Sequence, residues 1–416
     1  MSTNKTYPNR TRISAHNTFA ALKHRNYRLW FIGQVVSLVG TWMQSTAQGY
    51  LIYEITQSAA YLGIVSFANG LPALLLNLYG GVIADRVPRR TMLIVTQSSQ
   101  MVLAFILAWL TFSGLVQPWH IIILALLLGV ANAFDAPARQ SFVVELVSRE
   151  DLTNAIALNS IMFNSAIAVG PAAAGIAYAA LGPGWCFSIN GISFIAVIIA
   201  LAMMHIEWIP LDHQKRSVWA ELREGFSFVG KNRLVKTLIL NVFFISLFGL
   251  GYVTILPAWA VKQLNGNSST YGFLLSARGL GAVFSGLLLA SISTWHIRGK
   301  MFTIGGFVLP VMLAIFACTR RLPISMLALF GAGWGQISMF NNTNSMIQSN
   351  TPDELRGRIM GIYSLAFAGV TPIGALLAGE AAEYFGEPIT VIVGVVVMII
   401  TASVIFLRVP EVRRTE

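Results

Sequence analysis

The chain alternates long apolar segments with short polar ones, and this pattern sets the elements that we expect. Each apolar segment is about as long as the roughly 20 residues that a helix needs to cross a bilayer. Polar breaks with turn-forming residues, such as Val87-Pro88 and Asn265-Gly266-Asn267, separate the segments. The pattern predicts twelve membrane-spanning helices, at residues 29–52, 60–84, 91–114, 119–138, 153–180, 185–206, 236–260, 270–293, 301–318, 323–347, 358–381 and 389–407.

The longest polar stretch between spans, residues 207–235, divides the chain into two halves of six helices. It mixes aromatic with charged residues, which predicts an amphipathic cytoplasmic linker on the membrane surface. The halves also repeat, because Gly170-Pro171 in the fifth span matches Thr371-Pro372 in the eleventh. We therefore expect an all-α membrane protein of two pseudo-symmetric bundles, divided into a basic N-terminal tail (1–28), a first bundle (29–206), the linker (207–235), a second bundle (236–407) and a C-terminal tail (408–416).

Composition supports this class and excludes others. Of 416 residues, 55% are hydrophobic and only 11% are charged, whereas about 25% of the residues of a soluble domain are charged. Two cysteines, six scattered histidines and the lack of a Walker sequence offer no metal site and no nucleotide hydrolysis. We expect no enzyme activity, no cofactor, no metal and no nucleic-acid partner, despite the net charge of +11.

The basic residues predict the orientation in the membrane. If both termini are cytoplasmic, all but four of the 28 Lys and Arg residues lie near the cytoplasmic ends of spans, as expected for cytoplasmic loops. The remaining four are Lys262, Arg320, Arg321 and Arg278. We therefore expect a multi-pass protein of the cell's inner membrane, with both termini inside and anionic lipid as the partner of its basic face.

Three spans carry polar stripes at helical spacing. The stripes contain Gln34, Ser37, Thr41, Gln44 and Gln48 in the first span, Asn132, Asp135 and Arg139 in the fourth, and Ser338, Asn341, Asn342, Ser345 and Gln348 in the tenth. Each stripe occupies one helix face, so we expect it to line a cavity; hydrogen bonding between helices is the alternative. The seventh span offers a mainly aromatic face instead, with Asn241, Phe244, Phe248, Tyr252 and Trp259, which suits an amphipathic substrate that contains rings.

Few charges lie within the spans, and each costs about 2.5–3.5 kcal/mol at the bilayer centre. Asp135 and Arg139 are four residues apart and can pair with each other. Arg278 has no neutralising neighbour in sequence. We expect it either to bind an anionic group of a substrate or to pair with Glu54 or Glu380 at the outer ends of the first and eleventh spans.

Several motifs resemble one family of transporters. Gly81, Asp85, Arg86, Arg89 and Arg90 after the second span resemble the loop signature of the major facilitator superfamily, with Pro88 where that signature usually has glycine. Phe134-Asp-Ala-Pro137-Ala-Arg139-Gln140, Trp42-Met-Gln44, Tyr53-Glu54-Ile-Thr56 and Arg356-Gly357-Arg358-Ile-Met-Gly361 are similar to the branch of transmembrane secretion effectors, which includes enterobactin-exporter-like and macrolide-efflux-like proteins.

The resemblance implies roles for particular residues. Gly81 would allow close helix packing, and Asp85 would lie near the start of the eleventh span, with Arg139 as its partner, in a latch that closes the inner face. Arg86, Arg89 and Arg90 belong to the same latch or merely set the topology. Gly170 and Pro171 resemble, incompletely, the kink motif of drug–proton antiporters; a generic kink is the alternative.

The resemblance also implies a function. We expect a secondary transporter, working as a monomer, that exports a small amphipathic compound such as a drug or siderophore-like metabolite against proton entry. The coupling carboxylate would be Asp135, Glu54 or Glu380, with Asp135 first because it combines a polar stripe with a charged partner. An importer or uniporter of a polar metabolite, and a lipid-moving or non-transporting membrane protein, are the alternatives.

Overall fold

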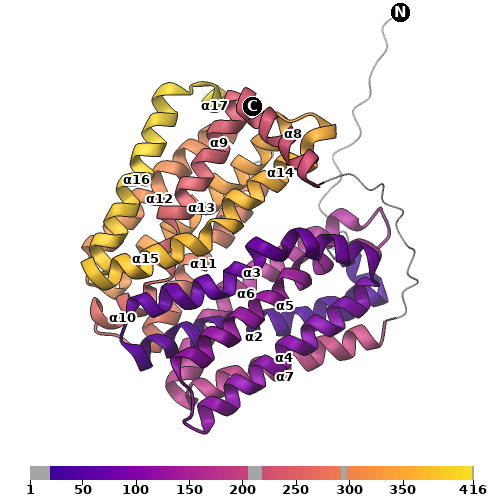
Figure 1. The fold of residues 1–416 in the computed structure, drawn as a ribbon, viewed down its shortest axis with the longest axis vertical. Coiled ribbons are helices and arrows are strands. Elements are labelled where there is room, and N and C mark those ends of the chain that lie inside the picture. The colour runs from indigo at the N-terminus through magenta and orange to yellow at the C-terminus, as the bar shows by residue number, and fades with distance from the viewer. Residues whose placement is uncertain (1–18, 205–217, 292–297, 415–416) are drawn as a thin grey trace, which may run out of the picture.

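The computed structural model describes residues 19–204, 218–291 and 298–414, which form helices joined by short turns (Figure 1). Side chains are described for all of these except residues 77–78, 80–82, 84–86, 218–222, 290 and 414. The first half comprises a short 3₁₀ helix, η1 (Ala20–Lys23), followed by α2 (Arg25–Thr56), α3 (Ala59–Arg86), α4 (Arg89–Phe112), α5 (Pro118–Glu145), α6 (Leu152–Leu181) and α7 (Pro183–Ala202).

The second half begins with α8 (Val218–Lys231), which lies in the expected linker and packs against α14 through Gly225. The other elements follow in the expected order. They are α9 (Arg233–Phe244), η2 (Ile245–Gly249), η3 (Gly251–Val253), α10 (Leu256–Lys262), α11 (Ser268–Ser291), α12 (Arg298–Cys318), α13 (Leu322–Ser349), α14 (Asp353–Ser364), η5 (Leu365–Gly369), α15 (Thr371–Phe385), α16 (Glu387–Arg408) and α17 (Glu411–Arg414).

Two segments that we expected to be single helices are interrupted. The seventh span changes from α9 to a π turn, η2, and a 3₁₀ turn, η3, before α10 begins, and the eleventh contains the π turn η5 between α14 and α15. The two irregular spans touch, because a Cβ on Gly374 of α15 would lie 2.5 Å from the carbonyl oxygens of Ser246 and Leu247 in η2. π turns shift the register of a helix, so the side chains beyond them do not continue the face before them.

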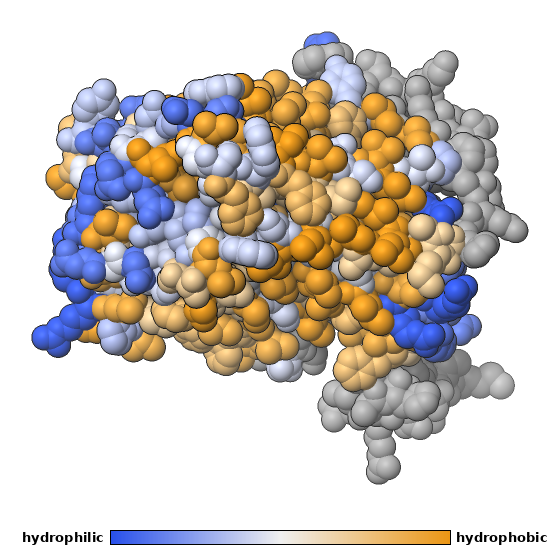
Figure 2. All heavy atoms as spheres, turned by 90° about the horizontal axis from the view of Figure 1, so that it is seen from below, coloured by the Kyte–Doolittle hydropathy of each residue, from blue (hydrophilic) through white to orange (hydrophobic). Residues whose placement is uncertain are grey.

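The arrangement is that of a membrane protein. Eleven helical segments in the described parts of the chain are long and apolar enough to span a bilayer. The remaining expected span, α2, is a helix of 32 residues and is long enough to cross the bilayer. Its many polar residues make it less apolar than the other eleven. Figure 2 shows hydrophobic side chains forming a belt between two ends at which hydrophilic side chains gather.

The two ends of the molecule differ in what they carry. We call the end with the turns at Gln57, Gly182 and Gly386 the distal end, and the end at which the described chain starts and finishes the termini end. Each of these turns has a positive φ, between 52° and 90°, which reverses the chain at the boundary of the belt.

The two halves pack against each other through glycines. A Cβ on Gly272 of α11 would lie 2.4 Å from the carbonyl oxygen of Pro171 in α6, and a Cβ on Gly70 of α3 would lie 2.2 Å from Pro372 Cγ of α15. Residues of both halves share one hydrophobic core, whereas a second core at the termini end contains residues of the first half alone, including Tyr27 and Phe142. Among the described residues, packing between the halves is therefore concentrated toward the distal end (Figure 1).

We predict that Gly272→Ala lowers the thermal unfolding temperature of the purified protein, because the added methyl group forces α6 and α11 apart at a backbone atom that cannot move away alone. Overpacking of this kind costs about 1–3 kcal/mol. Gly306→Ala in α12 is the matched control, since its Cβ would meet nothing within 4 Å. Equal unfolding temperatures for the two variants would contradict the role of Gly272.

Candidate functional site

A polar cavity of about 90 Å³ lies inside the first half, between α2, α4 and α5. The rings of Phe163 and Phe194, from α6 and α7, form part of its wall. Pockets for whole drug-sized ligands measure about 300–1,000 Å³, so this cavity has room for water or one substituent of a larger compound. Its polar lining consists of Gln34, Ser37, Thr41, Gln97, Gln100, Asn132, Asp135 and Arg139.

Asp135 is the centre of the hydrogen bonding in this cavity. Its side chain is buried, and its Oδ1 accepts hydrogen bonds from Thr96 Oγ1 at 2.8 Å and Gln97 Nε2 at 2.9 Å. Its Oδ2 lies 3.5 Å from Arg139 Nε, one turn along α5. The expected pairing of Asp135 with Arg139 is therefore confirmed, and α4 supplies two further donors that hold the carboxylate in place.

Two amide groups of the same lining have unused hydrogen-bonding capacity. Gln34 Nε2 and Gln97 Oε1 are buried and have no hydrogen-bond partner among the described residues. A buried polar group that forms no hydrogen bond costs about 1–3 kcal/mol. The Gln34 amide nitrogen as donor and the Gln97 amide oxygen as acceptor are thus available, in the cavity that contains Asp135, to bind water or a ligand.

The polar stripe of α2 serves two purposes. Gln34, Ser37 and Thr41 line the cavity as expected, but Gln44 accepts a hydrogen bond from Asn190 Nδ2 of α7 at 2.7 Å. Gln48 is buried farther toward the distal end. Cavity lining thus accounts for Gln34, Ser37 and Thr41, and hydrogen bonding between helices accounts for Gln44.

The α4 contribution to the site was not expected from the sequence. Thr96 and Gln97 bind Asp135, and Gln100 Nε2 donates to Asn132 Oδ1 at 3.2 Å. The signal that could have found them is the polar cluster at residues 96–100 within an otherwise apolar span.

Arg278 of α11 is a charged residue that lies well inside the belt in the described part of the second half. Its Nε donates to Tyr252 Oη at 3.1 Å and its Nη2 donates to Gln336 Oε1 at 3.0 Å. The expected alternative, in which Arg278 pairs with Glu54 or Glu380, is wrong: no described carboxylate lies within salt-bridge distance of it. Tyr252 was an expected site residue, whereas Gln336 of α13 lies two residues before the predicted stripe.

The polar residues of α13 have different environments. Ser338 is fully buried and lies 2.9 Å from Ser285 Oγ of α11, and Asn342 Nδ2 donates to the carbonyl oxygen of Ser338 at 2.6 Å. Asn341 is exposed. Interhelical hydrogen bonding, rather than cavity lining, therefore accounts for Ser338.

The aromatic face expected on the seventh span does not exist as one face, because η2 and η3 break its register. Asn241 is buried and donates to Met339 Sδ at 3.6 Å, and Trp259 stacks on Phe316 with ring centroids 4.4 Å apart. Phe244 and Phe248 are more than a third exposed, whereas Tyr252 is buried against Arg278. Phe248 and Tyr252 thus do not form one wall.

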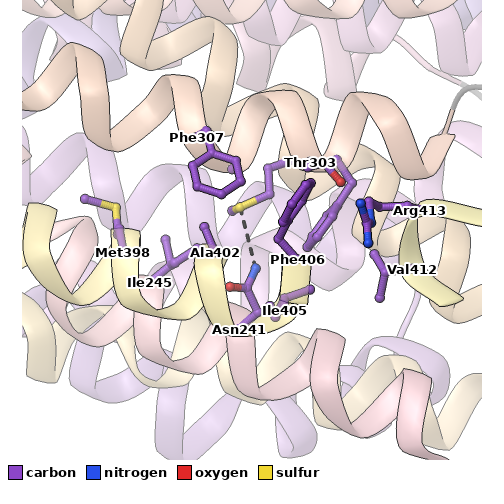
Figure 3. A pocket seen from close by; sticks show the side chains of 13 residues that line it. Asn241, Ile245, Thr303, Phe307, Met398, Ala402, Ile405, Phe406, Val412 and Arg413 are labelled. Carbon is purple, nitrogen blue, oxygen red and sulfur yellow. Dashed lines mark hydrogen bonds between the residues drawn. The ribbon is translucent and has the colours of Figure 1, made fainter. Parts of the chain in front are cut away.

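Asn241 points into a second hollow, between α9, α12 and α16 (Figure 3). This hollow measures about 10 Å³ and is lined mainly by apolar side chains, with Arg413 of α17 lying over the Phe406 ring at its end. A space of that size holds at most one water molecule. We interpret it as a packing gap and not as a binding site.

At the distal end, residues from both halves form a seal. Glu383 of α15 caps α3 of the other half, because its Oε2 accepts hydrogen bonds from Ser58 Oγ at 3.0 Å and from the Ala59 and Ala60 N–H groups at 2.7 and 3.4 Å. A carboxylate at a helix N-terminus also interacts favourably with the helix dipole. This cap joins the two halves at the distal end by charge-assisted hydrogen bonds.

Aromatic contacts complete the seal. The Tyr271 ring of α11 stacks on Tyr50 of α2, with centroids 6.4 Å apart, and the ammonium of Lys262 lies 5.9 Å from the Tyr53 ring centroid. Lys262 in turn pairs with the buried Glu387 at 3.3 Å. None of Lys262, Glu383 and Glu387 was an expected site residue, because a distal salt bridge has no periodic pattern in sequence.

Comparison with known proteins decides the family. The family model described as transmembrane secretion effector matches residues 16–416. The chain belongs to the transmembrane secretion effector family. Its relatives include a staphyloferrin A transporter of Staphylococcus aureus, 26% identical over 86% of this chain and 90% of the relative, and a multidrug efflux pump, Tap, of Mycolicibacterium fortuitum, 26% identical over 81% and 84%. A macrolide efflux protein A of Streptococcus pyogenes is 21% identical over 88% and 92%.

Solved structures agree on the fold of this secretion effector. The nucleoside transporter NupG superposes with a TM-score of 0.70 at 12% identity, covering 92% of this chain and 98% of the other. A bacterial homologue of the iron transporter ferroportin superposes with a TM-score of 0.67 at 16% identity, covering 91% and 98%. The expected major facilitator architecture is therefore confirmed, and the protein is a membrane transporter and not an enzyme.

The latch expected of the family is described only in part. The side chains of Gly81, Asp85 and Arg86 lie outside the described residues. Arg89 pairs with Glu145 of α5, and Arg90 Nε and Nη2 donate to the carbonyl oxygens of Leu201 and Ala202 at 2.6 and 2.8 Å. Both arginines thus tie the start of α4 to the ends of α5 and α7, within the first half, and Arg139 pairs with Asp135.

The remaining expected residues have defined places. α6 runs as one helix through Gly170 and Pro171, and Gly170 packs against α2, where a Cβ would lie 2.6 Å from Trp42 Cβ. Glu54 accepts a hydrogen bond from Tyr178 Oη at the distal end, and Glu380 lies half-buried on α15. Of the three acids considered for coupling, Asp135 alone lies in the polar cavity.

We predict that Glu383→Ala opens the distal seal. The variant removes the acceptor that caps α3, and a lost N-cap costs about 1 kcal/mol, or about fivefold in the balance between closed and open seal. The measurement is the rate at which an impermeant maleimide, applied from the distal side, labels Cys introduced at Leu275, one turn below Tyr271. Cys318→Ser removes the exposed native thiol, while Cys186 is buried.

Tyr384→Ala is the control for this labelling experiment, because the neighbouring tyrosine is 79% exposed and outside the cap. A labelling rate in Glu383→Ala no higher than in Tyr384→Ala would show that the cap does not hold the seal closed.

Proposed function

We propose that this secretion effector exports a small amphipathic compound across the bacterial inner membrane in exchange for protons. Relatives named as a staphyloferrin A transporter, a multidrug efflux pump and a macrolide efflux protein support transport of such compounds. The amphipathic class also fits the surroundings of the site, where amides and charged groups lie beside phenylalanine rings.

Alternating access is supported by where the halves touch. The seal of Glu383, Lys262 and the stacked tyrosines closes the distal end, while the cores of the two halves are separate at the termini end. A rocking motion that opens the distal end would have to break the polar contacts of the seal and separate the glycine-packed helices on which the two halves meet, whereas the first half keeps its own core at the termini end. Basic residues near the termini end favour placing that end in the cytoplasm.

The single observation that carries the coupling proposal is the position of Asp135. It is a buried carboxylate whose Oδ1 is fully engaged and whose Oδ2 has a long contact with Arg139. A proton that binds Oδ2 would neutralise Asp135 and leave the charge of Arg139 without its partner. In a low dielectric, the loss of this attraction would change the free energy of the conformation that contains the pair. We also propose that the transporter works as a monomer surrounded by lipid.

We predict that Asp135→Asn uncouples transport from the pH gradient. Everted vesicles with an acidic interior would be supplied with erythromycin, norfloxacin and 2-naphthoate, and accumulation of each would be measured. Gradient-driven accumulation by the variant should be at least about tenfold lower than that of the wild type, which corresponds to ~1.4 kcal/mol. Exchange of preloaded compound should persist, because asparagine preserves the shape of the side chain but cannot bind the proton.

Asp353→Asn is the matched control, because this acid is 82% exposed on α14. Gradient-driven accumulation at the wild-type level in Asp135→Asn would remove Asp135 from coupling. Accumulation in right-side-out vesicles instead of everted ones would show an importer.

A further inference from the structure

The charge of Arg278 is unbalanced within the described part of the molecule. Its two hydrogen-bond partners, the Tyr252 hydroxyl and the Gln336 amide oxygen, are both neutral. The other cation within the belt, Arg139, has a carboxylate partner, and so does Lys262 at the distal edge. An unbalanced guanidinium inside a membrane protein is costly and marks a place where an anion is stabilised.

Arg278 lies on α11, a helix of the second half that packs against α6 of the first half. It lies seven residues after Tyr271 on α11, and residues seven apart share one face of a helix. Tyr271 stacks on Tyr50 of the other half, whereas the Arg278 side chain contacts Tyr252 and Gln336 of its own half. At 1.5 Å per residue, Arg278 lies about 10 Å below the distal seal, on the side toward the termini end.

The guanidinium is both held in position and partly free. Of its five N–H donors, Nε–H binds Tyr252 and one Nη2–H binds Gln336, which fixes the plane of the fork. The two Nη1–H groups and the second Nη2–H remain for a ligand. A planar carboxylate can take one hydrogen from each of the two terminal nitrogens, in the paired geometry that makes arginine a strong carboxylate binder.

We propose that Arg278 is an anion-binding subsite and that the compound transported by this protein carries a carboxylate, which binds end-on to the Arg278 fork. The proposal rests on the transport function proposed above and narrows its substrate class. Tyr252 and Gln336 are positioning residues, because they hold the fork and do not themselves supply the charge.

The test is ligand-induced stabilisation of the purified full-length protein in detergent. Matched pairs of aromatic carboxylate and carboxamide would be used, namely benzoate and benzamide, 2-naphthoate and 2-naphthamide, and 9-anthroate and 9-anthramide. The carboxylates should raise the unfolding temperature of the wild type, and the amides should not. Arg278→Gln should weaken carboxylate binding at least tenfold, and Arg278→Lys should retain part of it, because lysine keeps the charge without the fork.

Gln336→Glu separates loss of the subsite from misfolding. This variant places a built-in carboxylate 3.0 Å from the Arg278 guanidinium at the position of the amide oxygen. It should raise the unfolding temperature without ligand and abolish the response to the carboxylates, since the internal acid occupies the fork. Arg321→Gln, which changes an exposed arginine at the distal end, is the charge-matched control and should bind as the wild type does.

The proposal is overturned if no carboxylate stabilises the wild type more than its amide does, or if the preference survives in Arg278→Gln or Gln336→Glu. Because these measurements involve no gradient and no transport, a failure of proton coupling or of export direction in vesicles would leave a measured carboxylate preference standing.

Discussion

The need to satisfy polar groups inside an apolar belt governs this structure. A helix that carries amides and charges through a membrane must turn them toward partners, because lipid offers none. Asp135 meets this need with Arg139 on its own helix and with Thr96 and Gln97, which join α4 to α5. Gln44 meets it with Asn190, which joins α2 to α7. These bonds add to the apolar contacts that hold the helices of the first bundle in register.

The joint between the bundles follows a different rule. Four glycines let the backbones of opposite halves approach closely, namely Gly63, Gly175, Gly272 and Gly379. A larger side chain at these positions would not fit between the helices. The polar contacts of the joint are gathered at the distal end, where Glu383 caps α3. A contact between a carboxylate and a helix end is lost with a small rotation, whereas the cores inside each half are not. The cores inside each half are therefore the rigid parts of the fold, and the polar contacts at the distal end are the parts that can open.

Sequence periodicity predicted the order of the spans, because the length of an apolar helix is fixed by the membrane. It did not predict the breaks at η2 and η5, and the close contact of Gly374 in α15 with the carbonyl groups of η2 joins segments that are distant in sequence. The prediction of one aromatic face on the seventh span was wrong because η2 and η3 change the register of that helix. The pairing of Asp135 with Arg139 was predictable, because both lie on one helix, whereas Gln336 and Glu383 act across helices and left no local pattern.

The two charged sites differ in a way that bears on coupling. Asp135 and Arg139 lie inside the first bundle, whereas Arg278 lies in the second bundle, bound to Tyr252 and Gln336. A proton and a carboxylate compound would therefore bind different halves, without competing for one group. Protonation of Asp135 would release Arg139, which lies one turn nearer the termini end, where Asp85 of α3 is its expected family partner. If the released Arg139 then paired with Asp85, as the family resemblance implies, the proposed proton step would be linked to closure of the termini end, because a contact at the edge of the bundle would replace the lost pair inside it.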